Sequence, residues 1–101
     1  MPRLEQLEAL LAAEPDDVFL NYSMAMELAK AQRFDESLAR FARVIELDPN
    51  YIAAYSQQGK TLVQLGRRDE ARQVLAAGID RAKALGNRHA QDDMEQLLRA
   101  L

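Results

Sequence analysis

The chain of 101 residues contains no cysteine and has no long hydrophobic run. Without cysteine it has no disulfide bond, zinc–thiolate site, iron–sulfur cluster or thiol nucleophile. No stretch approaches the roughly 20 apolar residues of a membrane-spanning helix, and the segment from Met1 to Gln6 lacks the apolar core of a signal peptide. These absences predict a cytoplasmic protein that does not bind a membrane.

An excess of basic residues is also missing. The chain has 13 Lys and Arg against 16 Asp and Glu, a formal net charge of -3, and no local basic patch. A protein with this net negative charge does not attract the phosphate backbone of a nucleic acid, so we expect no nucleic-acid partner. The composition of 49% hydrophobic and 29% charged residues is typical of a globular protein, and the length suits a single domain over residues 1–101.

The sequence contains an internal repeat of 34 residues, visible first in the spacing of Pro15 and Pro49. A shift of this length superimposes six further identical pairs: Leu28 on Leu62, Arg33 on Arg67, Asp35 on Asp69, Glu36 on Glu70, Ala42 on Ala76 and Ile45 on Ile79. The two Arg-x-Asp-Glu segments lie between stretches of helical apolar spacing, so we interpret Asp35 and Asp69 as helix N-caps. Each repeat is therefore predicted to be a helix, a turn and a second helix.

This pattern resembles the tetratricopeptide repeat (TPR), a 34-residue helical hairpin with characteristic aromatic, small and proline positions. In the second repeat these positions hold Tyr55, Gln58-Gly59, Leu62, Ala71 and Leu75; in the first they hold Asn21, Met24-Ala25, Leu28, Ser37 and Phe41, with Asp48-Pro49 closing it. Asn21 in place of the aromatic residue and Lys83 in place of the second proline depart from the pattern. Lys83 predicts that the second repeat ends in a longer helix.

The residues at these positions also have a packing interpretation. Small Ala25 and Gly59 would let the two helices of a hairpin approach closely, with large residues filling the seam, namely Leu28, Leu62, Phe41 and Leu75. Gly66 suits a left-handed turn after the first helix of the second repeat. The first repeat has Gln32 there, at a cost of about 1 kcal/mol.

The flanking segments fit the same phase. Leu4, Leu7, Leu10 and Leu11 precede Pro15 at helical spacing, so residues 3–13 read as the second helix of an incomplete repeat. After Gly86-Asn87, an amphipathic helix is predicted with apolar Ala90, Met94, Leu97, Leu98 and Leu101, and its polar side would cap the array. We therefore expect an all-α protein with helices at 3–13, 17–31, 35–47, 51–65, 69–84 and 88–100. The layout is a half-repeat at 3–13, repeats at 18–51 and 52–85, and a cap at 88–101.

Two short patterns resemble a phosphate-binding loop and a metal site, but each lacks residues or neighbouring elements that such a site needs. Gly59-Lys60-Thr61 resembles the end of a phosphate-binding loop, but Ala54 stands where that motif needs glycine and no strand precedes it. His89 with Asp92 and Asp93 could contact a metal from one helix turn, although a solvated polar face explains them as well. Ser23, Ser37, Ser56 and Thr61 lie within predicted helices without a neighbouring base. We expect no metal, no cofactor and no enzymatic activity.

TPR arrays are protein-interaction scaffolds whose first helices line a concave groove, and the resemblance implies the same role here. The groove positions are Phe19, Tyr22, Met26, Ala29 and Lys30 in the first repeat and Ala53, Ser56, Gln57, Lys60, Val63 and Gln64 in the second. The best candidates for contact with a partner are Phe19, Tyr22, Met26, Lys30, Ser56, Gln57, Lys60 and Gln64. Lys30 and Lys60 favour an acidic ligand.

Three alternatives stay open at this level. The Phe19, Tyr22 and Met26 stripe could pack within the array, or it could be buried in a homodimer. Residues 1–50 carry 5 basic and 10 acidic groups, and residues 51–101 carry 8 and 6, so head-to-tail association is also electrostatically permitted. The carboxylate clamp of some family members is disfavoured, because its Lys and Asn positions hold Tyr22, Met26, Ala53 and Gln57, or Asn87 and Gln91 in the last helix.

Overall fold

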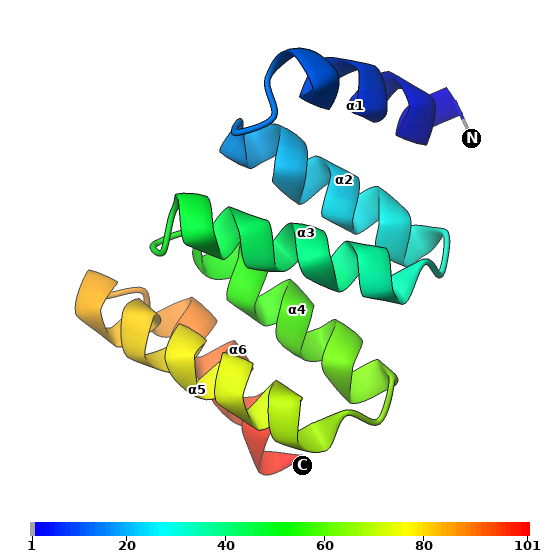
Figure 1. The fold of residues 1–101 in the computed structure, drawn as a ribbon. Helices are drawn as coiled ribbons and strands as arrows, with labels where there is room; N and C mark the ends of the chain where they lie inside the picture. Colours follow the sequence, from blue (N-terminus) through cyan, green and yellow to red (C-terminus); the bar gives the residue numbers. More distant parts are fainter. Residues whose placement is uncertain (1) are drawn as a thin grey trace. The chain divides into compact units, whose positions relative to one another are not determined.

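The computed structural model describes residues 2–101, which form six helices and no strand (Figure 1). Met1, the first residue of the expected domain, lies outside the described residues. The helices are α1 (Pro2–Ala13), α2 (Val18–Lys30), α3 (Phe34–Leu47), α4 (Ile52–Gln64), α5 (Arg68–Leu85) and α6 (Arg88–Arg99). Their bounds agree with the predicted ones to within one or two residues, and α5 is the longest helix, as Lys83 indicated. The chain divides into two compact units, with the boundary between Asp48 and Pro49.

In the first unit, α1 packs on α2 through leucines at helical spacing. Leu4, Leu7 and Leu11 are buried against Met24 and Leu28 of α2. This spacing places the three leucines on one side of α1, so a single apolar stripe makes the contact. Asp17 caps the start of α2, because its side-chain carboxylate accepts a hydrogen bond from the backbone N–H of Leu20 at 2.8 Å.

The hairpin of α2 and α3 buries a small residue on α2 and a large one on α3. Ala25 and Phe41 are both fully buried, as the packing interpretation predicted. Ser37, also fully buried, donates a hydrogen bond from Oγ to the backbone carbonyl of Ala25 at 2.8 Å. This bond satisfies a buried hydroxyl and links α3 to α2.

In the second unit, glycine takes the position that alanine has in the first. A Cβ atom built on Gly59 of α4 would lie 2.5 Å from Cδ2 of Leu75 on α5, which is closer than real side chains approach. The smaller residue is therefore needed because Leu75 fills the space directly above it.

The last helix, α6, packs on α5 and α4 of the same unit. Met94 is its fully buried residue, and Gly78 makes room for it. A Cβ atom on Gly78 would lie 2.6 Å from both Met94 Sδ and Tyr55 Cβ, so α5 is in close contact with both neighbours at this point. The sequence interpretation had assigned no role to Gly78.

Asn21 and Tyr55 occupy the same position of their repeats and make the same hydrogen bond. The Tyr55 hydroxyl donates to the carbonyl of Pro49 at 2.7 Å, and Asn21 Nδ2 donates to the carbonyl of Pro15 at 3.0 Å. Arg40 completes the polar substitution, because its Nη1 donates to Asn21 Oδ1 at 2.9 Å. Asn21, which replaces the aromatic residue of the repeat pattern, is thus a buried amide whose nitrogen and oxygen are both hydrogen-bonded.

The turns after α2 and α4 are the same backbone motif with different residues. Gln32 has φ of 62° and Gly66 has φ of 76°, which confirms the predicted left-handed conformation of both. In each turn the following residue closes the motif, with the N–H of Arg33 bonded to the carbonyl of Leu28 and the N–H of Arg67 bonded to that of Leu62, both at 2.9 Å.

The predicted N-caps at Asp35 and Asp69 are wrong. Helix α3 begins at Phe34 and α5 at Arg68, so both aspartates lie in the first turn, where a negative charge is favoured by the helix dipole. The residues at the cap positions are Arg33 and Arg67, and neither makes a side-chain capping hydrogen bond.

Candidate partner-binding site

The four predicted contact residues of the first repeat lie along one face of α2 and differ in exposure. Phe19 is 65% exposed and Lys30 is exposed, whereas Tyr22 and Met26 are half-buried. The spacing of three and four residues keeps all four on one side of the helix. This face therefore presents an open aromatic ring at one end and a cation at the other.

Tyr22 has a second role inside the unit. Its ring packs edge-on against the fully buried ring of Phe41, with centroids 5.9 Å apart and an interplanar angle of 63°. Such an aromatic pair contributes about 0.5–1.5 kcal/mol beyond its buried area. Tyr22 is consequently shared between the exposed face and the core.

Lys30, the cation at the end of this face, belongs to a small cluster of ion pairs. Lys30 Nζ and Arg3 Nε each lie 3.6 Å from Oε1 of Glu27, whose side chain is only 15% exposed. The lysine side chain itself is 70% exposed. The surplus of one positive charge therefore faces solvent beside α2.

The corresponding face of α4, in the second unit, is polar. Ser56 and Gln57 are half-buried, while Lys60 and Gln64 are exposed. Thr61 does not belong to this face, and its hydroxyl donates a hydrogen bond to the backbone carbonyl of Gln57 at 2.8 Å. The Gly59-Lys60-Thr61 triplet thus lies inside a regular helix.

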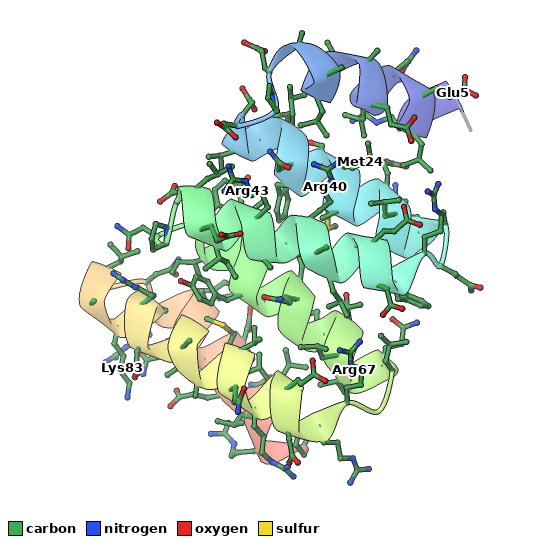
Figure 2. All side chains as sticks on the ribbon, viewed as in Figure 1. Glu5, Met24, Arg40, Arg43, Arg67 and Lys83 are labelled. Carbon is green, nitrogen blue, oxygen red and sulfur yellow. The ribbon has the colours of Figure 1, made fainter. Side chains whose placement is uncertain are left out.

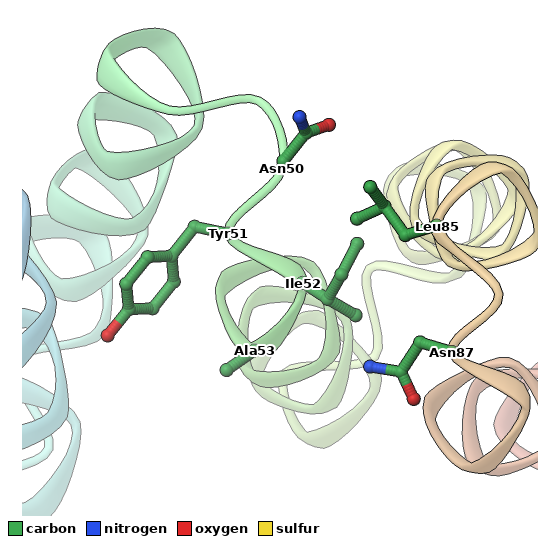
Figure 3. A pocket seen from close by; sticks show the side chains of 6 residues that line it. All are labelled: Asn50, Tyr51, Ile52, Ala53, Leu85 and Asn87. Carbon is green, nitrogen blue, oxygen red and sulfur yellow. The ribbon is translucent and has the colours of Figure 1, made fainter.

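The second unit also contains an open pocket that the sequence analysis missed (Figure 3). It has a volume of about 450 Å³ and lies between the start of α4 and the turn that joins α5 to α6. Its residues are Asn50, Tyr51, Ile52, Ala53, Leu85 and Asn87. Leu85 is 50% exposed because α5 extends past the position where the first repeat has its proline, and that extension was the available sequence signal.

In the first unit, two adjoining hollows of about 360 and 240 Å³ are lined in common by Glu8, Met24 and Arg40. Figure 2 shows Met24 and Arg40, which come from α2 and α3. The Arg40 guanidinium is committed in part to the buried amide of Asn21. Sequence reasoning missed this polar pair, because residues 21 and 40 are far apart in the chain.

At the starts of α3 and α5, an exposed ion pair joins the arginine at the cap position to a glutamate in the first turn. Arg33 binds both carboxylate oxygens of Glu36, with distances of 3.0 Å from Nε and 2.6 Å from Nη2, and Arg67 binds Glu70 in the same way. The hydrogen bonds from Arg33 and its positive charge lower the pKa of the Glu36 carboxyl. They raise the pKa of Arg33 in turn.

The candidate metal ligands remain a pair of exposed side chains. His89 Nε2 lies 3.4 Å from Oδ2 of Asp93, one turn along α6. Within residues 2–101, no group of three or more His, Cys, Asp or Glu side chains is placed to hold a metal ion. The same residues contain no helix with the length and apolar character needed to cross a membrane.

Repeated helical hairpins with small residues at the closest contacts define the class of the fold. The family model described as "Tetratricopeptide repeat" matches residues 28–93, and the chain belongs to this family. TPR domains are generally non-catalytic modules for protein interaction.

Individual relatives agree with this assignment. The chain is 29% identical to the TPR repeat-containing protein PA0015 of Pseudomonas aeruginosa over 97% of its own length and 93% of that protein. A TPR domain protein from Salinibacter ruber has 30% identity and a TM-score of 0.79, with 85% of this chain and 87% of that one covered. The TPR2B domain of yeast Sti1, solved in complex with pHsp70, has a TM-score of 0.87 and 23% identity, with 95% and 77% covered.

Proposed function

We propose that this protein is a non-catalytic cytoplasmic adaptor that binds a peptide or a helix of a partner protein through the first helices of its repeats. The proposed contact residues are Phe19, Tyr22, Met26 and Lys30 on α2 and Ser56, Gln57, Lys60 and Gln64 on α4. No cofactor, metal, nucleic acid or membrane takes part in this function.

The observation that carries the proposal is the exposure of Phe19. A phenylalanine that is 65% exposed contributes little to the core of its own unit. Aromatic and methionine side chains are enriched at protein interfaces, where they provide large or adaptable contact area. The adjacent half-buried Tyr22 and Met26 extend the same apolar face.

The chemistry of the ligand follows from the remaining side chains. Lys30 and Lys60 are exposed cations, and Ser56 and Gln57 offer hydrogen bonds. We therefore infer a ligand with an apolar residue for the α2 face and an acidic group for the lysines.

Comparison with known proteins supports binding to a protein partner. The TPR2B domain of yeast Sti1 was solved with pHsp70 bound, and its fold is similar to that of this chain. The clamp positions, however, hold Tyr22 and Met26 rather than Lys and Asn. We infer that the ligand is held mainly by apolar contact on α2.

The proposed domain layout keeps residues 3–13 as a half-repeat, 18–51 and 52–85 as repeats, and 88–101 as a cap. Met94 supports the cap role, because it is fully buried while Arg88, Asp92, Gln96 and Arg99 of the same helix are exposed. If α6 caps the array, deleting residues 88–101 should cause aggregation or unfolding. A soluble, cooperatively folded truncation would contradict this role.

The binding proposal can be tested with peptides selected from a displayed library on the wild-type protein. Titration calorimetry should show that Phe19→Ala weakens the selected peptides by about tenfold or more, since central aromatic contacts carry much of the energy of an interface. Leu85→Ala is the matched control, because Leu85 is also a large exposed apolar residue but lies at the end of α5, outside the proposed contact residues. Equal affinity of the wild type and the Phe19 variant would refute the proposal.

Two further variants sharpen the result. Lys30→Glu and Lys60→Glu should weaken only acidic peptides. A homodimer through the same stripe is the alternative function, and sedimentation distinguishes it because Phe19→Ala would then convert a dimer to a monomer. Tyr22→Ala is a poor test, since it also removes the contact with Phe41.

A further inference from the structure

Helix α1 has an exposed face beside the leucines that pack on α2. Its members are Arg3, Gln6, Leu10 and Ala13 of α1 and Glu14, the residue that follows the helix; all are exposed, with Leu10 at 51%. Their spacing places them within roughly 100° of one another around the helix, beside the leucines that pack on α2. Glu14 continues the helical turn, because its N–H bonds to the carbonyl of Leu10 at 3.0 Å.

The repeat shows what this face normally contacts. Leu10 corresponds to Val44 and to Gly78 in the 34-residue register. Val44 is fully buried, and a Cβ atom on Gly78 would lie 2.6 Å from Cβ of Tyr55, on the first helix of the same repeat. Leu10 is therefore exposed at a position that is buried or in close contact in both repeats.

We propose that this face of α1 binds the same face of a second copy of the protein, with the two helices antiparallel. An antiparallel alignment that sets Arg3 opposite Glu14 of the other copy also sets Glu14 opposite Arg3, because a two-fold interface makes each contact twice. The two Leu10 side chains then lie about 4.5 Å apart along the helix axis, given a rise of ~1.5 Å per residue.

The side chains available for these pairs are suitably placed. Arg3 is 58% exposed and contacts Glu27 through Nε at 3.6 Å, which leaves its terminal N–H groups for another carboxylate. Glu14 is exposed at the opposite end of the face. The face therefore has opposite charges at its two ends and a leucine between them, which makes it complementary to itself in the antiparallel arrangement.

Helix α6 is a less suitable binding surface for α1 of a second copy. Counted from the residue that precedes each helix, Glu95 of α6 takes the position that Ala25 has on α2 and Gly59 has on α4, where the hairpins have a small residue. The half-buried Glu95 carboxylate accepts a hydrogen bond from Gln91 at 3.4 Å. A helix cannot approach α6 there as closely as α5 approaches Gly59, and this favours pairing of α1 with α1 over head-to-tail contact.

The association is expected to be weak. A pair of short helices buries less than the roughly 1,200 Å² of a standard interface, so we expect a Kd on the order of 100 µM. The first 48 residues carry 5 basic and 10 acidic groups, so like-charge repulsion opposes the contact at low salt. The Kd of the dimer should therefore be measured at about 0.15 M salt, where the Debye length is ~8 Å and the repulsion is screened.

The test is sedimentation equilibrium of the full chain, from about 10 µM to 1 mM, a range that brackets the expected Kd. The wild type should dimerise with increasing concentration, and Leu10→Lys should remain a monomer. Leu85→Lys is the matched control, because Leu85 is equally exposed but lies in the second unit. A wild type that stays monomeric at the highest concentration overturns the proposal, as does equal loss of the dimer in both variants.

Charge exchange tests the antiparallel register without touching the core. Arg3→Glu and Glu14→Arg should each weaken the dimer by roughly tenfold, since each breaks two ion pairs and adds repulsion, and the double variant should restore the wild-type Kd. Failure of the double variant to restore the dimer refutes the register. A dimer lost with Phe19→Ala but retained with Leu10→Lys would assign the interface to α2 and overturn the proposal.

Discussion

Replacement of Gln32 by glycine tests the backbone argument most directly. Gln32 is the only non-glycine residue with positive φ among residues 2–101, at 62°, while the equivalent position of the second repeat is Gly66. A side chain in this conformation costs roughly 1–2 kcal/mol, and glycine in turn loses about 0.5–1 kcal/mol through the greater freedom of the unfolded chain. Gln32→Gly should therefore raise the free energy of unfolding by about 1 kcal/mol.

The local structure keeps other contributions small. The Gln32 side chain is exposed, and its backbone N–H bond to the carbonyl of Ala29, at 3.0 Å, does not depend on it. For a domain of about 100 residues, 1 kcal/mol corresponds to a rise in Tm of roughly 4–8 °C. Thermal and urea unfolding followed by far-UV circular dichroism would measure both quantities.

Two variants serve as controls. Gln32→Ala shortens the same exposed side chain but keeps the left-handed strain, so it should give no comparable gain. Gly66→Gln should destabilise by about 1 kcal/mol, because a Cβ atom there meets nothing within 4 Å and only the backbone cost is added. An unchanged or lower Tm for Gln32→Gly, or an equal gain with Gln32→Ala, would refute the reasoning.

Three further outcomes follow from the packing and the charges. Gly78→Ala should lower stability by about 1–3 kcal/mol in denaturant unfolding, because the added methyl group overpacks the contact between three helices. Asn21→Ala should cost roughly 2–3 kcal/mol, since it removes buried hydrogen bonds and leaves Arg40 without its amide partner, and Arg40→Met combined with it should recover part of that loss. In an NMR pH titration, the Glu36 carboxyl should show a lowered pKa that Arg33→Ala returns toward the ordinary value; the stabilisation from this pair is present above the unfolded-state pKa and is lost as the pH falls through the folded-state pKa.

The sequence by itself determined the helices, their order and the repeat. These depend on local spacing: leucines at helical intervals mark the buried side of α1, and Gly66 marks a turn that only a left-handed residue can close. The exposed Phe19 could also be identified in this way, because the opposite side of α2 already supplied its core residues.

Tertiary structure decided what depends on residues distant in the chain. Asp35 and Asp69 lie in the first helical turn and not at the predicted cap position. The sequence could not show this, because a helix can begin one or two residues earlier at little cost. Spacing alone could not show that Arg40 satisfies Asn21, or that Tyr22 packs on Phe41, since these partners are brought together only when α3 packs against α2. The sequence therefore determined which helix faces exist, and three-dimensional packing decided which side chains on those faces remain exposed.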